Sequence, residues 1–187
     1  MPQIRTLAAL LALSLAACTT RPPAPAAPTT TTILLVRHAE RAPGDGDVSL
    51  SDAGQARARA LRDALGGRRI VRIVTTEWAR TQQTAAPTAA VLGLTPEIVR
   101  SASRDAAADA RALITRLRAE NRGQTVLVVG HSNTIPPMLA VLVGRAVADF
   151  GSGDYDGLYE IVLDGERLVT AERRRYGADD GVPDPVL

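Results

Sequence analysis

The chain has 187 residues, of which 45% are hydrophobic but only 3% aromatic, and its formal net charge is +2. This length suits one domain with appendages, and the absence of lysine among its 22 basic residues excludes a P-loop and a Schiff-base lysine. Few aromatic side chains and a small charge argue against nucleic acid as a partner, since stacking and counterion release drive such binding.

The first 17 residues are predicted to be a signal peptide. Arg5 precedes an apolar stretch over Leu7–Ala17, which is too short to span a bilayer. Leu15-Ala16-Ala17-Cys18 resembles the lipobox of bacterial lipoproteins, which implies cleavage before Cys18 and a lipid on its sulfur. The residue after Cys18 is Thr19 and not Asp, which resembles the pattern of lipoproteins that are sorted to the outer membrane. We therefore expect an anchored protein of the bacterial envelope that faces the periplasm. The alternative is an ordinary secretory signal with an incidental cysteine.

The rest of the chain divides into a tether, a domain and a tail. Residues 18–31 are rich in Pro, Ala and Thr and are predicted to form an extended tether. Residues 32–176 form the predicted domain, and the acidic residues 177–187 a loose tail.

Strands and helices are predicted to alternate along the domain. The strands are Ile33–Arg37, Ile70–Thr75, Glu97–Val99 and Thr125–Val129, and the helices are Ser51–Leu65, Ala79–Leu92, Asp105–Glu120 and Thr134–Val143. Such alternation favours βαβ units and a mainly parallel sheet. Asp164-Gly165 between Leu158–Leu163 and Leu168–Arg173 predicts an antiparallel hairpin at the end.

The chain's two histidines each follow an apolar predicted strand. His38 follows the first strand, directly after Arg37, and His131 follows the fourth. Ligands of open α/β sheets bind outside the carboxyl ends of the strands, so we expect the two imidazoles to meet there. Arg80, about one turn into the helix after the second strand, is expected to join them. Arginine forks match phosphate oxygens, and neighbouring cations keep an imidazole unprotonated and nucleophilic.

Four segments resemble, in order, the motifs of the histidine phosphatase (phosphoglycerate mutase-like) superfamily. They are Val36–Glu40, Leu50–Ala58, Thr75–Ala85 and Val128–Ser132. The resemblance extends from Ile33 to about Tyr176. It implies a three-layer α/β/α sandwich, with His38 as the phosphoryl acceptor and with Arg37, Arg80 and His131 as the phosphate pocket. It implies neither a metal nor another cofactor.

The same resemblance implies a carboxylic acid that protonates the leaving group. Phytase-like members have an acid directly after the second histidine, where this chain has Ser132. Asp105 fits the position of the acid in mutase-like members, although a helix start there favours the ionised carboxylate. Glu40, one turn after the nucleophile, is the competitor. A good leaving group would make both dispensable.

We expect a metal-independent phosphomonoesterase that acts on a small phosphorylated substrate through a phosphohistidine on His38. Arg41 and Asn133 are candidates for the rim of the site, Trp78 is predicted to pack, and Asp154–Asp156 are predicted to form a turn. The alternatives are a non-catalytic lipoprotein that binds phosphate or phosphosugars, and a mutase-like phosphotransferase. A metallohydrolase is disfavoured, since no His-x-x-x-His or similar spacing occurs. The particular ester and the oligomeric state stay open.

Overall fold

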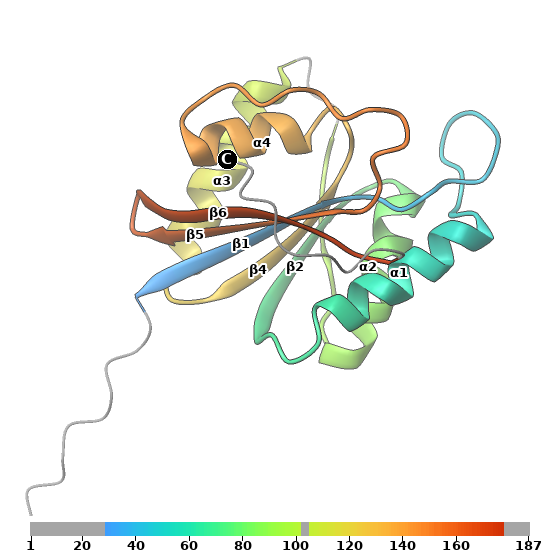
Figure 1. Cartoon of the computed structure of the whole chain (residues 1–187), viewed down its shortest axis with the longest axis horizontal. Helices are drawn as coiled ribbons and strands as arrows, with labels where there is room; N and C mark the ends of the chain where they lie inside the picture. Colours follow the sequence, from blue (N-terminus) through green and yellow to red (C-terminus); the bar gives the residue numbers. More distant parts are fainter. Residues whose placement is uncertain (1–28, 102–104, 178–187) are drawn as a thin grey trace, which may run out of the picture.

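The computed structural model describes residues 29–101 and 105–177. Within these residues, six strands form one sheet in the order β3-β2-β4-β1-β5-β6 (Figure 1). The strands are β1 (Thr30–Arg37), β2 (Ile70–Thr76), β3 (Glu97–Val99), β4 (Thr125–Gly130), β5 (Gly157–Asp164) and β6 (Arg167–Arg175), and the helices are α1 (Asp52–Ala64), α2 (Ala79–Leu92), α3 (Ala106–Glu120) and α4 (Ile135–Val143).

Strands β1 to β4 run parallel to one another, and β5 and β6 form the predicted antiparallel hairpin. The central strand β1 pairs in parallel with β4, with Arg37 opposite Gly130, and antiparallel with β5. Strand β2 lies on the other side of β4, again in parallel. The carboxyl ends of β1, β2 and β4 therefore meet at one edge of the sheet. The predicted α/β class with a mainly parallel sheet is confirmed.

Helices cover both faces of the sheet, so the fold has the predicted three layers. In Figure 1, α1 and α2 lie on one face and α3 and α4 on the other. Successive residues of β1 point to opposite faces. Ile33 and Leu35 pack with α3 and α4, whereas Leu34 and Val36 pack with α1 and α2. Burial on both faces explains why the strands are continuous apolar runs.

The first strand begins earlier than its apolar run. Thr30 and Thr31 pair with Asp164 and Leu163 of β5, although their composition is that of the predicted tether. Cross-strand pairing with β5, which no local pattern encodes, extends the strand. The predicted signal peptide, Cys18, residues 18–28 of the tether and residues 178–187 of the tail lie outside the described residues. None of the described helices has the length and hydropathy needed to cross a membrane.

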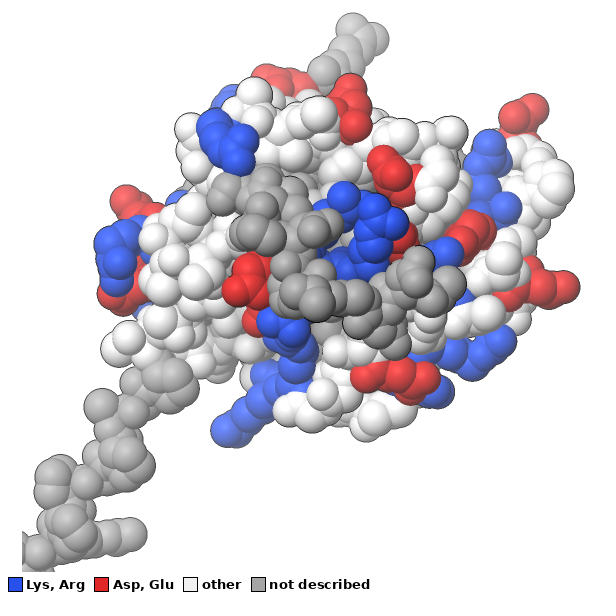
Figure 2. All heavy atoms as spheres, in the orientation of Figure 1, with Lys and Arg blue, Asp and Glu red and all other residues white. Residues whose placement is uncertain are grey.

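Acidic and basic side chains are interspersed over the face seen in Figure 2. On β6, Arg173 and Arg175 lie 3.6 and 3.4 Å from the carboxylate of Asp156. Arg174 lies 3.1 Å from Glu172. The run of three arginines in β6 is therefore partly neutralised by neighbouring acids, and surface pairs of this kind contribute little to stability.

Two glycines let backbone segments approach each other next to the histidines. A Cβ on Gly54 of α1 would lie 2.0 Å from the carbonyl oxygen of Glu40, so the absence of a side chain lets α1 pack on the segment after His38. A Cβ on Gly130 would lie 2.7 Å from Oγ1 of Thr134. These two close approaches hold the loops that carry His38 and His131 against the helices that follow them.

Candidate active site

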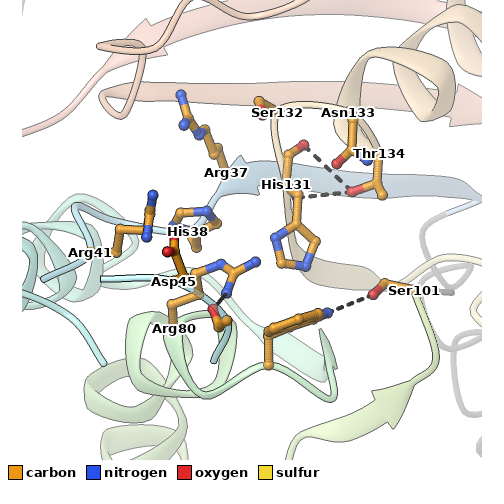
Figure 3. Close-up of a pocket in the computed structure, with 12 residues that line it drawn as sticks. Arg37, His38, Arg41, Asp45, Arg80, Ser101, His131, Ser132, Asn133 and Thr134 are labelled. Atoms are coloured by element: carbon orange, nitrogen blue, oxygen red, sulfur yellow. Dashed lines mark hydrogen bonds between the residues drawn. The ribbon is translucent and has the colours of Figure 1, made fainter. Parts of the chain in front are cut away.

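The carboxyl ends of the parallel strands open into a pocket of about 470 Å³ (Figure 3). The residues that line it come from the ends of β1 and β4, the loop after β1, the start of α2 and the segments after β3 and β4: Arg37, His38, Arg41, Asp45, Gly46, Trp78, Arg80, Ser101, His131, Ser132, Asn133 and Thr134. The two imidazoles lie in edge contact, with their ring centroids 5.3 Å apart. The structure thus brings together the four residues predicted to form the phosphate site, namely Arg37, His38, Arg80 and His131.

The hydrogen bond of His38 fixes which of its ring nitrogens can react. Nδ1 lies 2.7 Å from the carbonyl oxygen of Ala39. A carbonyl oxygen only accepts, so Nδ1 carries the hydrogen and the neutral ring has its lone pair on Nε2. Burial lowers the pKa of His38 to about 4, with the Ala39 carbonyl acting against this shift and Arg80 adding to it. At neutral pH the ring is therefore a free base with an available nitrogen.

His131 is anchored through a chain of hydroxyl groups. Its Nε2 lies 2.9 Å from Oγ1 of Thr76, which lies 2.9 Å from Oγ1 of Thr81. The Thr81 hydroxyl donates to the carbonyl of Trp78 at 2.8 Å. The backbone N–H of His131 donates to Oγ1 of Thr134 at 2.8 Å. Burial, and after it the neighbouring His38, lower the pKa of His131 to about 3, so this ring is also neutral.

Arg37 is buried beside His38 and is held by the loop before β5. One terminal nitrogen donates to the carbonyl of Gly151 at 2.8 Å, and the guanidinium lies 4.1 Å from the ring centroid of Tyr155. The Tyr155 ring is itself 6.0 Å from that of His38. The sequence predicted only a turn here, so the contact of Tyr155 with the site is new. Within the described residues, the buried Nε of Arg37 has no hydrogen-bond partner, which leaves a donor for an anion.

Arg80 faces the pocket from the first turn of α2, stacked on an indole. Its guanidinium carbon lies 4.4 Å from the ring centroid of Trp78, whose Nε1 donates to Oγ of Ser101 at 2.9 Å. Trp78 was predicted only to pack, but it also lines the pocket. Its place two residues before Arg80 is the signal that could have revealed this. In the described part of the chain the buried Nε of Arg80, like that of Arg37, is unpartnered.

Arg41 and Asn133, the two rim candidates, both line the pocket. Arg41 donates to the carbonyl of Gly44, within the loop that follows β1. Asp47 of this loop accepts a hydrogen bond from the N–H of Ala79 at 2.8 Å, which ties the loop to the start of α2. The loop thereby closes one side of the pocket.

The two carboxylates predicted as proton donors do not line the pocket. Glu40 points to α1, where both of its oxygens accept from Nε of Arg57 at 2.8 and 3.0 Å. Burial acts to raise the pKa of Glu40, but the hydrogen bonds from Arg57 and from a backbone N–H, together with the charges of Arg57 and Arg37, outweigh burial and lower it. Asp105 is exposed and caps α3 by accepting from the N–H of Ala108 at 2.9 Å. Asp45, which no sequence pattern singled out, is the carboxylate among the described residues that line the pocket.

Within the described ranges, no group of three or more His, Cys, Asp or Glu residues is arranged to hold a metal ion. Apart from Asp45, the charged groups that line the pocket are cations, namely the guanidinium groups of Arg37, Arg41 and Arg80. Guanidinium groups suit the oxygens of an anion, and a neutral imidazole has one ring nitrogen with a free lone pair.

The fold and the site therefore define an α/β protein with an anion pocket built on paired histidines. Residues 33–104 match the model of the histidine phosphatase superfamily (branch 1). This match spans three of the four motifs, and the fold brings the fourth, with His131, to the same pocket. The predicted resemblance to that superfamily is confirmed. No curated protein sequence matches the chain.

Solved structures of the same fold include several phosphatases. A mycobacterial glucosyl-3-phosphoglycerate phosphatase matches with a TM-score of 0.63 and 16% identity, over 80% of this chain and 100% of that one. Phosphoserine phosphatase from Entamoeba histolytica, in complex with 3-phosphoglyceric acid, matches with a TM-score of 0.58 and 15% identity, over 80% and 98% of the two chains. YhfR from Bacillus stearothermophilus matches with a TM-score of 0.60 and 19% identity, over 74% and 94%. At these identities the likeness is one of fold. With the family match, it supports an enzyme of the phosphatase or phosphotransferase class.

Proposed function

We propose that the chain is a metal-independent phosphomonoesterase that works through a covalent phosphohistidine on His38. The observation that carries the proposal is the hydrogen bond from Nδ1 of His38 to the Ala39 carbonyl, which leaves Nε2 as an unprotonated nucleophile. That nitrogen lies in a pocket whose other charged groups are mainly arginines, so a phosphate ester would be bound directly beside it.

The reaction takes place in two displacements. Arg37, Arg80 and His131 bind the phosphoryl oxygens, and the Nε2 lone pair attacks phosphorus as the P–O bond to the alcohol breaks. Water then attacks the phosphorus of the phosphohistidine, the P–N bond breaks, and inorganic phosphate leaves with Nε2 restored. Positioning and neutralisation of the charge on the equatorial oxygens supply most of the rate in phosphoryl transfer.

The departing alcohol needs a proton unless it is a good leaving group. Asp105 and Glu40 fit the family's pattern in the sequence, but Asp45 is the carboxylate found among the pocket-lining residues. We therefore assign the role of proton donor to Asp45 ahead of Glu40 and Asp105.

The direct test is turnover of p-nitrophenyl phosphate by the full chain and by His38→Ala. Loss of the nucleophile should lower kcat by at least about a thousandfold, as loss of a covalent nucleophile does elsewhere. His131→Ala is the matched control: it removes an imidazole from the same pocket but retains the nucleophile, so its loss should be smaller. Equal turnover by His38→Ala and the unmodified chain would overturn the mechanism. Tight phosphate binding without turnover would favour the non-catalytic alternative.

The location follows from the lipobox-like segment and is a separate proposal. A diacylglyceryl group on Cys18 would anchor the domain to the bacterial envelope, since the resemblance is to lipoproteins. In Cys18→Ala the domain should move from the membrane fraction to the soluble envelope fraction. Retention of this variant in the membrane fraction would argue against the lipid anchor.

A further inference from the structure

A second pocket of about 310 Å³ adjoins the first. The two pockets share three lining residues, Ser101, Asn133 and Thr134. In Figure 3 these residues lie on the His131 side of the site, away from Arg41. A molecule that placed an anionic group among the arginines could therefore extend past the shared residues into the second pocket without leaving the protein surface.

The inner wall of this second pocket is aliphatic. It is formed by Val99, the last residue of the short strand β3, by Ala110 and Leu113 of α3, and by Met138 of α4. Ala110, Leu113 and Met138 are 1%, 9% and 8% exposed and belong to the core that packs between the sheet and these helices. We call these four residues the apolar subsite. An aliphatic wall offers no partners for hydroxyl groups, whereas an apolar group gains free energy by leaving water there.

Charged and polar side chains also line the second pocket. Arg100 and Asp109 are exposed. Arg116 pairs with Glu97 at 2.7 Å and with Glu120 at 3.8 Å. Thr76 is engaged with His131.

The first pocket is thus lined mainly by cations, whereas the buried part of the second pocket's wall is apolar. The polar side chains of Ser101, Asn133 and Thr134 lie between them. A phosphate ester has a matching construction, with an anionic phosphate at one end and an organic group at the other.

From this juxtaposition we propose that the apolar subsite receives the organic half of the substrate. On this basis the enzyme selects phosphomonoesters of compact apolar alcohols, aryl or branched alkyl, over esters of sugars or amino acids. The cavity is at the small end of the range for ligand pockets, which suits one compact group rather than a long chain. The inference rests on the proposed function for the position of the phosphate, but it can be tested without turnover.

The test is the binding of non-hydrolysable phosphonates to the full chain, measured by titration calorimetry. Naphthylmethylphosphonate has the anionic head and an apolar body, methylphosphonate has the head alone, and 2-hydroxyethylphosphonate has a polar body. Because burial of several carbon atoms is involved, naphthylmethylphosphonate should bind at least about tenfold more tightly than either of the others.

Two matched substitutions on α3 test whether the preference for naphthylmethylphosphonate arises in the apolar subsite. Ala106 lines the second pocket, whereas its neighbour Ala107 is exposed and does not. Ala106→Phe should narrow the apolar subsite and remove the preference for naphthylmethylphosphonate, while Ala107→Phe should leave it intact. Ala112→Phe, at an exposed position that also lines the pocket, provides a second narrowing variant if Ala106→Phe does not fold.

Equal affinity of the unmodified chain for the three phosphonates would overturn the inference, and so would equal effects of the Ala106 and Ala107 substitutions. The two proposals fail separately. Turnover that depends on His38 but shows no apolar preference would overturn the subsite alone. Apolar preference in binding without turnover of any ester would uphold the subsite and overturn the proposed hydrolysis.

Discussion

At the scale of single residues, the neighbouring carbonyl of Ala39 and not a carboxylate orients the ring of His38. In many catalytic histidines a carboxylate accepts a hydrogen bond from the second ring nitrogen, which makes the ring more basic. A neutral carbonyl fixes the tautomer without adding negative charge. Burial and the arginines then keep the pKa of His38 near 4, so the ring is unprotonated at neutral pH.

This low pKa predicts the acid side of the pH–rate profile. Protonation of Nε2 removes the nucleophile, so kcat/KM should fall about tenfold per pH unit below about 4, after correction for ionisation of the substrate. Arg80→Met removes a cation that lowers the pKa of His38. Its acid limb should therefore move to higher pH, because protonation becomes easier. Arg111→Met, at an exposed position outside the pocket, is the control. An acid limb in Arg80→Met that is unchanged or moves to lower pH would contradict this explanation.

The assignment of the proton donor predicts a dependence on the leaving group. Asp45→Asn should lower kcat for benzyl phosphate, whose alcohol needs a proton, by about a hundredfold. It should have little effect on p-nitrophenyl phosphate, whose phenolate leaves unaided. Glu40→Gln and Asp105→Asn are the comparison variants. If either of them shows this selective loss in place of Asp45→Asn, that residue is the donor.

At the scale of elements, the loops after β1, β3 and β4 assemble the site around a rigid sheet edge. The histidines and Arg80 were predictable, because apolar runs and helix spacing indicate where a strand ends and a helix starts. Asp45, Ser101 and Tyr155 were not, since they lie in segments without hydrophobic periodicity. Their positions depend on tertiary contacts such as the Trp78–Ser101 hydrogen bond.

The packing of α1 on the segment after His38 predicts a sensitive glycine. In Gly54→Ala the new methyl group would overlap the Glu40 carbonyl, so the helix or the loop must shift. The free energy of unfolding should fall by about 1–3 kcal/mol, the usual cost of overpacking. Urea denaturation measures this change. Gly153→Ala, where an added Cβ meets no atom within 4 Å, is the control. Similar losses in both variants would mean that the close approach at Gly54 is unimportant for stability.

At the scale of the whole molecule, the order of the strands accounts for the position of the site. Because β4 lies between β1 and β2, residues almost a hundred positions apart in the sequence meet at one edge. Strand and helix alternation predicted the class of the fold, and the four motifs predicted its family resemblance. The early start of β1 could not be predicted, because pairing with a strand from the far end of the domain creates it.

The proposed reaction requires that a phosphoryl group passes through His38. The most direct measurement is to mix the full chain with a ³²P-labelled phosphomonoester, quench it in alkaline denaturant within the first turnover, and identify the labelled peptide. We expect alkali-stable, acid-labile label on the peptide that contains His38, and none in His38→Ala. Turnover without such label, or label on His131 instead, would contradict it.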